Sequence, residues 1–157
     1  MSRYPLARLH DVRKHAEEEA ALAVGRCTMA LEQARADLVR REDELAQYIK
    51  WRIKEEALRF EKIRNTEISL AQVERYKQDI LTLRGNEVQY EERILQAKRH
   101  IKECEEQLDT ARLEHVTAIR ERRKIDEHQA RWLEEDRRER ERAEELELED
   151  FTVRTPE

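Results

Sequence analysis

The sequence predicts an all-α protein in which two long helices form an antiparallel coiled-coil hairpin, with the second helix longer and overhanging the first. Three observations support this fold class. Charged residues make up 44% of the 157 residues, and the chain has two Gly and two Pro, a composition typical of long helices with few tight turns. A capped interruption lies at residues 65–69. Apolar residues recur every seven positions on both sides of it, as coiled coils require.

The composition limits what the chain can bury and bind. Only 38% of the residues are hydrophobic, so we expect a thin seam between helices rather than a thick core. The net charge is -5 with acids and bases interspersed, which argues against nonspecific nucleic-acid binding. No apolar run is long enough for membrane insertion. The opening MSRYPLARLH lacks the apolar core of a signal peptide, so we expect a cytoplasmic protein with Cys27 and Cys104 reduced.

The first helix is predicted over residues 5–64, because Pro5 is a favoured first helical residue. Its apolar residues repeat every seven positions at Val24, Leu31, Leu38 and Leu45. Beyond Leu45 they step by four, to Ile49, Ile53, Ala57 and Phe60. Such a step is a stutter, which unwinds a supercoil locally.

The interruption at residues 65–69 is predicted to be a helix–helix turn. Ser69 and Gln72 have the spacing of a capping box, and Ile68 and Val73 that of a hydrophobic staple. Asn65 tolerates the left-handed conformation and is the expected end of the first helix. A connection this short favours antiparallel neighbours. The alternative is one uninterrupted helix that dimerises.

The second helix is predicted over about 70–149, followed by a short tail at 150–157, all within a single hairpin domain over 1–157. One heptad row of this helix contains no charge and consists of Tyr76, Leu83, Tyr90, Ala97, Cys104, Ala111, Ala118, Ile125 and Trp132. The other row begins Val73, Ile80, Glu87, Ile94, Ile101, Leu108 and His115. The pattern predicts a left-handed coiled coil. Residues from about 130 to 150 then overhang as a single charged helix.

Folding the chain between residues 67 and 68 brings the two heptad patterns into agreement. Large side chains then meet small ones, which allows close packing. The facing pairs are Val24 with Ala111, Cys27 with Leu108, Leu31 with Cys104, Ala34 with Ile101, Leu38 with Ala97, and Leu45 with Tyr90. In this register the two cysteines lie in adjacent layers, which disfavours a disulfide.

The register also places the stutter beside the least helix-favouring stretch of the second helix, RGN at residues 84–86. Glu87 faces Tyr48 at this level. We expect loosened packing or a bend there. The alternative is that Gly85 makes room for Trp51 or Ile49.

The sequence predicts neither an enzyme nor a metal or cofactor site. The five His residues are scattered, and a pair of helices offers no cleft that would shift carboxylate pKa values. Partner contacts are therefore the expected chemistry. Most aromatic residues fall on seam positions, and Trp51 fits the seam worst, which makes it the best single candidate for a contact with another protein.

Several stretches of the chain resemble the YscO family of type III secretion stalk proteins, whose flagellar relative is FliJ. These stretches are RYPLARLHDVRKH at the start, QYIKWR before the turn, and EDF near the end. The resemblance implies a cytoplasmic hairpin at the base of the secretion apparatus that acts as the central stalk of a hexameric secretion ATPase. The implied partners are that ATPase, the export gate protein and export chaperones. Whether the protein is itself exported stays open.

The resemblance also implies where each partner binds. The end of the coil that carries the termini would meet the ATPase, through Tyr4, Arg8, Arg13, Lys124 and Arg131. The half near the turn would meet the gate, through Tyr48, Trp51, Tyr76 and Ile80. We expect a monomer in isolation.

Two other classes of function fit the same residues. One is a structural coiled-coil dimer in which residues 65–69 are only a hinge. The other is a chaperone-like adaptor that holds partner proteins without an ATPase. Solution mass separates the first from a hairpin, and binding to a secretion ATPase separates the second from a stalk.

Overall fold

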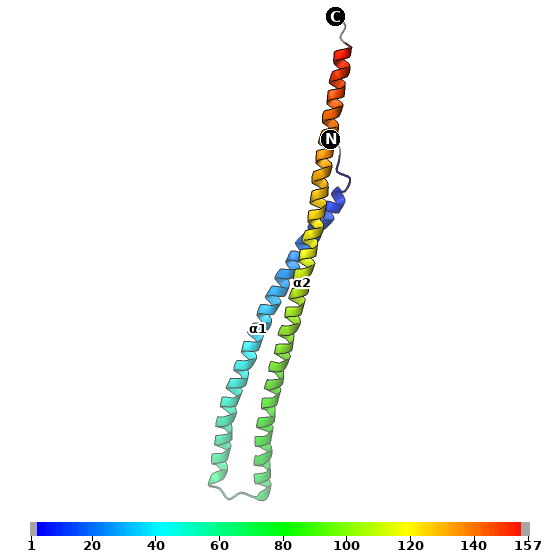
Figure 1. Cartoon of the computed structure of the whole chain (residues 1–157). Helices are drawn as coiled ribbons and strands as arrows, with labels where there is room; N and C mark the ends of the chain where they lie inside the picture. The colour runs from blue at the N-terminus through cyan, green and yellow to red at the C-terminus, as the bar shows by residue number, and fades with distance from the viewer. Residues whose placement is uncertain (1–2, 155–157) are drawn as a thin grey trace. The chain divides into compact units, whose positions relative to one another are not determined.

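The chain forms two long helices joined by a short turn (Figure 1), described over residues 3–154 in a computed structural model. Helix α1 runs from Ala7 to Arg64 and helix α2 from Leu70 to Val153. They pack against each other as a helical hairpin with α2 the longer. The all-α hairpin predicted from the sequence is therefore confirmed.

The hairpin divides into two compact units, each containing part of both helices. The turn unit spans Arg26–Asp109 and includes residues 65–69. The terminal unit comprises the residues up to Gly25 and those from Thr110 onward. Each unit is considered by itself below, and the single-domain organisation over 1–157 stays a prediction.

Helix α1 begins two residues later than predicted. Pro5 and Leu6 form a turn, in which the backbone N–H of Ala7 donates to the Tyr4 carbonyl at 3.3 Å. The first bond of helical spacing runs from the His10 N–H to the Leu6 carbonyl at 2.9 Å. Pro5 therefore precedes the helix instead of opening it, and its missing N–H leaves no donor unsatisfied there.

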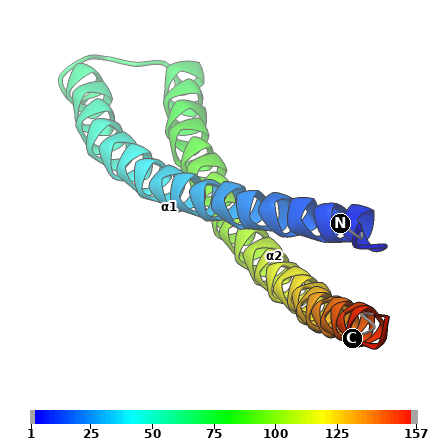
Figure 2. The same cartoon turned by 90° about the horizontal axis from the view of Figure 1, so that it is seen from above.

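The turn contains the predicted capping box. The Ser69 N–H donates to Gln72 Oε1 at 2.9 Å, and the Gln72 N–H donates to Ser69 Oγ at 3.3 Å. Together these bonds satisfy two donors that a helix start would otherwise leave open. Figure 2 shows residues 65–69 as an extended connection from one helix to the other.

The predicted left-handed end of α1 at Asn65 is wrong, because no described residue other than glycine has a positive φ. Thr66 ends α1 instead. Its hydroxyl donates toward the carbonyls of Lys62 at 3.0 Å and Ile63 at 3.3 Å. The Thr66 side chain thus donates to the last carbonyls of α1. In a helix that ends in a left-handed residue, backbone N–H groups would donate to these carbonyls instead.

The seam of the turn unit contains residues of both predicted heptad rows, and the predicted register itself stays a prediction. Its buried residues are Leu31, Ala34, Leu83, Ala97, Cys104 and Leu108. Tyr48 contacts Leu83 and Tyr90, which lie before and after Glu87 in the chain, and Glu87 is the residue predicted to face Tyr48. In the terminal unit, Tyr4 contacts His128 and Trp132, on either side of the position expected opposite Pro5. Both cysteines are free thiols.

Fewer residues are buried toward the turn, and the loosening or bend expected at the level of Gly85 stays a prediction. No described α1 residue after Ala34 is buried, and no α2 residue before Leu83. Helix α2 nevertheless continues unbroken through Gly85, and a Cβ at Gly85 would meet nothing within 4 Å. The interpretation that Gly85 makes room for Trp51 or Ile49 is therefore wrong.

Helix α2 extends four residues beyond its predicted end at 149, so residues 150–153 are helical rather than part of the tail. No glycine or proline interrupts the stretch before Pro156, and the Thr152 hydroxyl donates to the Glu149 carbonyl at 2.8 Å. Residues 155–157 of the predicted tail lie outside the described residues. Apolar side chains of this last stretch, including Leu146, Leu148 and Phe151, are exposed.

Candidate partner-binding site

The described residues offer surfaces for protein contacts. No described helix has a stretch apolar and long enough to cross a membrane. Nor does the described part of the chain hold a group of three or more His, Cys, Asp or Glu side chains that could bind a metal ion. The residues that the sequence singled out as partner contacts lie in both units.

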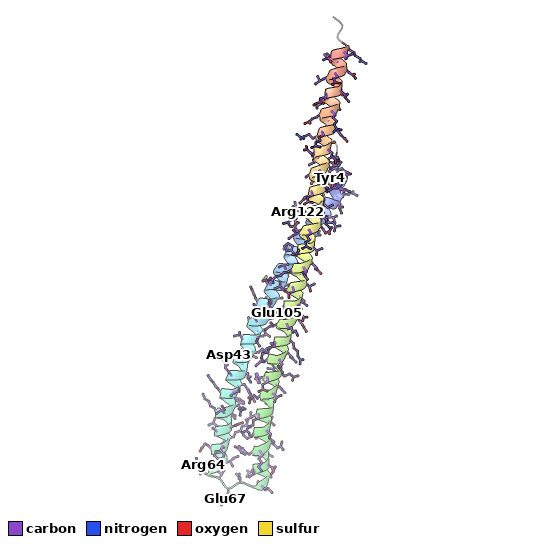
Figure 3. All side chains as sticks on the ribbon, viewed as in Figure 1. Tyr4, Asp43, Arg64, Glu67, Glu105 and Arg122 are labelled. Atoms are coloured by element: carbon purple, nitrogen blue, oxygen red, sulfur yellow. The ribbon has the colours of Figure 1, made fainter. Side chains whose placement is uncertain are left out.

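An aromatic cluster fixes the N-terminal segment onto α2 in the terminal unit, where Figure 3 labels Tyr4. Tyr4 is buried, and its ring meets Trp132 edge-on with centroids 5.4 Å apart. The Tyr4 hydroxyl lies 2.6 Å from His128 Nδ1. A buried tyrosine with its hydroxyl paired stabilises the packing around it, and the predicted contact of Tyr4 with the ATPase stays a prediction.

Polar side-chain contacts join the two helices beside this cluster. His10 Nε2 lies 2.7 Å from Asp126 Oδ1, and Arg122 Nη1 donates to Glu17 at 2.8 Å. The hydrogen bond to Glu17 raises the pKa of Arg122 above its ordinary value. Sequence reasoning missed Arg122 and His10, although the predicted register brings Arg122 near Glu17 and would have indicated the pair.

The five residues predicted to face the ATPase have different environments. Arg13 and Lys124 both approach Glu121, at 3.9 Å and 3.2 Å. Arg8 and Arg131 are exposed. The cationic surface that the terminal unit offers to a partner therefore rests mainly on Arg8, Lys124 and Arg131, while Tyr4 and Arg13 take part in contacts between the helices.

In the turn unit, Tyr48 and Trp51 come together in an aromatic hollow. The Tyr48 ring stacks on Tyr90 with centroids 4.6 Å apart, and its hydroxyl donates to the Leu83 carbonyl at 2.6 Å. Trp51 lies 5.7 Å from Tyr48 and is about half exposed. The Arg93 guanidinium lies 5.1 Å from the Tyr90 ring centre. We call this the Trp51 hollow.

The Trp51 hollow is open, with a volume of about 540 Å³. It is lined by Arg41, Glu44, Gln47, Tyr48, Trp51, Tyr90 and Arg93. Aromatic faces with flanking guanidinium groups suit an apolar or aromatic side chain of a partner, with polar groups at its rim. Trp51 is about half exposed, which agrees with the expectation that it fits the seam worst, and its role in binding stays a prediction.

Tyr76 and Ile80 do not join the Trp51 hollow. Tyr76 lines a second hollow of about 290 Å³ beside the turn, with Arg59 and Asp79 among its other walls. Ile80 is half-buried. The four residues predicted to face the gate are therefore divided between two places in the turn unit.

Sequence reasoning missed a network of charges inside the seam of the turn unit. Arg52 approaches Glu87 at 3.0 Å and donates to Glu56 at 3.0 Å, while Arg84 donates to Glu56 at 3.2 Å. Burial would raise the pKa of Glu56, but the hydrogen bonds from Arg84 and Arg52 outweigh it and the pKa is lowered. The hydrogen bond to Glu56 raises the pKa of Arg52. Two features of the sequence could have indicated this network: Glu87 is a charged residue at a seam position, and Arg52 and Glu56 have the i, i+4 spacing of an ion pair on one helix.

The sequence profile of the family described as Type III secretion protein YscO matches residues 6–154 of the chain. The chain belongs to the YscO family. Two solved structures resemble this YscO-family hairpin. A crystal structure of YscO from Vibrio parahaemolyticus superposes with a TM-score of 0.85 at 28% sequence identity, covering 93% of this chain and 92% of the other. A putative YscO homolog, CT670 from Chlamydia trachomatis, has a TM-score of 0.74 at 21% identity, covering 98% and 94%. No curated protein matches the chain by sequence.

Proposed function

We propose that this YscO-family protein is the central stalk of a type III secretion ATPase, coupling the hexameric ATPase to the export gate and to export chaperones. The family match over residues 6–154 carries the proposal. The protein would work in the cytoplasm at the base of the secretion apparatus. It would act by binding and transmitting movement, without catalysing a reaction or carrying a cofactor.

The two units suit different partners. In the terminal unit, Arg8, Lys124 and Arg131 are exposed and provide cationic contacts for the ATPase. The cluster of Tyr4 with Trp132 holds the N-terminal segment in place, so that force on one helix is shared with the other. In the turn unit, the Trp51 hollow offers apolar and aromatic contacts to the gate or a chaperone. Unbroken helices transmit displacement well because each turn is hydrogen-bonded to the next.

Binding and stimulation of the host's secretion ATPase test this proposal. We expect the purified full chain to bind the hexamer and raise its rate of ATP hydrolysis. The double variant Arg8→Glu with Arg131→Glu should lose stimulation by several fold, because it reverses two cationic contacts. Arg64→Glu, at the end of α1 beside the turn, is the matched control and should stimulate normally. The proposal is wrong if the unaltered chain neither binds nor stimulates the ATPase.

A further inference from the structure

The rings of the Trp51 hollow are held in place by contacts within the hairpin. Tyr48 stacks on Tyr90 with centroids 4.6 Å apart, and its hydroxyl donates to the Leu83 carbonyl at 2.6 Å. Trp51 lies 5.7 Å from Tyr48 and is 49% exposed. Side chains that are ordered before a partner arrives lose less conformational entropy on binding. The hollow therefore presents an ordered aromatic surface, with half of Trp51 open to a partner.

Arg93 adds a positive charge that has no counterion. Its guanidinium lies over the Tyr90 ring, 5.1 Å from the ring centroid, and the side chain is exposed. No carboxylate of residues 3–154 comes within ion-pair distance of it. A guanidinium over an aromatic ring still has N–H groups that can donate to a carboxylate, often in pairs. Arg93 is therefore available to an acidic group of a partner.

The other charges of the hollow are already paired. Arg41 donates to Glu44 at 3.4 Å and approaches Asp37 at 3.7 Å. Gln47 donates to Asp43 at 2.9 Å. Glu44 is the one carboxylate among the described lining residues, and its partner is Arg41. The charge of the hollow that is left without a partner is therefore positive.

This charge selects between two kinds of ligand that aromatic hollows bind. A cage for an ammonium group needs ring faces that are open to the cation, but here Arg93 already lies over Tyr90. Two guanidinium groups and one carboxylate give the lining a net charge of +1, which repels a second cation and attracts a carboxylate. The hollow therefore suits an acidic ligand and disfavours a basic one.

The shape of the hollow favours a side chain of another protein over a small molecule. Its volume is about 540 Å³ and it is open to solvent. Small-molecule sites bury most of the surface of their ligand, which an open hollow does not. A side chain that projects from a protein segment needs to bury only its tip, because neighbouring residues of the segment contact the rim.

We propose that the Trp51 hollow binds a protein segment that presents an aromatic side chain beside a carboxylate. The aromatic ring would lie against Trp51 and Tyr48, and the carboxylate would accept hydrogen bonds from Arg93. The proposal deepens the contact proposed above with the gate or a chaperone and rests on that proposed function, because it states the chemistry by which such a partner is recognised.

Binding of blocked dipeptides to the full chain tests this chemistry. The probes are N-acetyl-Asp-Phe-amide, N-acetyl-Lys-Phe-amide and N-acetyl-Asp-Ala-amide. The readout is the indole N–H resonance of Trp51 in nuclear magnetic resonance spectra, distinguished from that of Trp132 by the variant Trp132→Phe. We expect the Asp-Phe probe to shift the Trp51 resonance with a dissociation constant of about 1–10 mM. The Lys-Phe and Asp-Ala probes should bind about threefold more weakly or less, and the Trp132 resonance should not move.

Arg93→Gln tests the role of the charge. We expect it to bind the Asp-Phe probe about threefold more weakly and to lose the preference for Asp-Phe over Lys-Phe. Arg99→Gln, which removes another exposed arginine of α2 outside the hollow, is the matched control and should keep the preference. Both variants should keep the helicity of the unaltered chain, because both side chains are exposed.

Three results would each overturn the proposal. The Trp51 resonance does not shift with about 20 mM Asp-Phe probe, the Lys-Phe probe binds as tightly as the Asp-Phe probe, or Arg93→Gln keeps the preference. Stimulation of the ATPase by the same preparation tests the stalk role separately. A chain that stimulates the ATPase without this preference keeps the stalk role and loses the recognition proposed for the hollow, whereas a chain with the preference but no stimulation loses the stalk role.

Discussion

At the residue scale, the aromatic side chains of this protein have two different roles. Tyr4 is buried against Trp132 and His128, while Trp51 is half exposed beside Tyr48. Seam aromatics stabilise the hairpin, and exposed aromatics are available to partners. Substitutions at the two positions should therefore separate stability from binding.

Trp51→Ala should weaken partner binding while leaving the hairpin intact. A half-exposed tryptophan contributes little to folding, but an aromatic anchor in an interface often contributes about 2 kcal/mol of binding free energy. Circular dichroism should show unchanged helicity, and pull-down with the gate protein or a chaperone should show reduced binding. Lost helicity would mean that Trp51 belongs to the seam.

Tyr4→Phe should destabilise the terminal unit by about 1 kcal/mol, because His128 loses its hydroxyl partner while the ring contact with Trp132 remains. Urea unfolding measures the change in the free energy of unfolding. Tyr76→Phe, in the turn unit, is the matched control and should have a smaller effect. Equal effects of the two variants would contradict the assigned role of the Tyr4 hydroxyl.

At the scale of the elements, the turn depends on side chains that satisfy the helix ends. Ser69 and Gln72 cap the start of α2, and the Thr66 hydroxyl bonds the last carbonyls of α1. Few apolar contacts support the helices near the turn, since no residue between Ala34 of α1 and Leu83 of α2 is buried. Capping should therefore matter more here than in a tightly packed hairpin.

Ser69→Ala should lower the free energy of unfolding by about 1 kcal/mol, the usual cost of losing an N-cap. Hydrogen exchange should accelerate most at the first amides of α2. Thr82→Ala removes a hydroxyl that bonds the Gln78 carbonyl inside α2, and it is expected to be neutral or slightly stabilising because alanine favours the helix interior. If exchange near the turn does not change in Ser69→Ala, the capping box has no energetic role.

At the scale of the whole molecule, two kinds of seam hold the helices together. Leu31, Ala34, Ala97 and Cys104 provide apolar burial, and the network around Glu56 provides charge pairing closer to the turn. Apolar burial does not depend on pH, whereas charge pairing does. The change in the free energy of unfolding at acidic pH should therefore measure the contribution of the charged part of the seam.

Glu56→Gln should flatten the acid dependence of stability. The lowered pKa of Glu56 means that its stabilising contribution is present above the ordinary value of 4.5 and is lost as the pH falls through the lower folded value. Urea unfolding at pH 7 and in the range below 4.5 should show a smaller difference for Glu56→Gln than for the unaltered chain. Glu61→Gln, an exposed carboxylate on the same helix, should keep the original dependence. Identical pH profiles for Glu56→Gln and the unaltered chain would contradict this role.

The sequence by itself determined the two helices and the turn between them. Capping at Ser69 and heptad spacing depend on residues that are neighbours in the chain, so they act in the same way wherever the helices lie. The register drawn from pairing large with small residues stays a prediction. The position of Thr66 rather than Asn65 at the end of α1 was not predicted, because both residues can end a helix and their local signals are similar.

Only the tertiary structure decided which face of each helix enters the seam beyond Leu45. The row Ile53, Ala57 and Phe60 is more apolar than the row of Arg52 and Glu56, so the sequence favoured the first. Packing selected the second because Glu87 already occupies a seam position on α2 and pairs with Arg52. A largely covered carboxylate needs a cationic partner more than an apolar stripe needs cover, so the charged row enters the seam while Ile53 and Phe60 are left exposed.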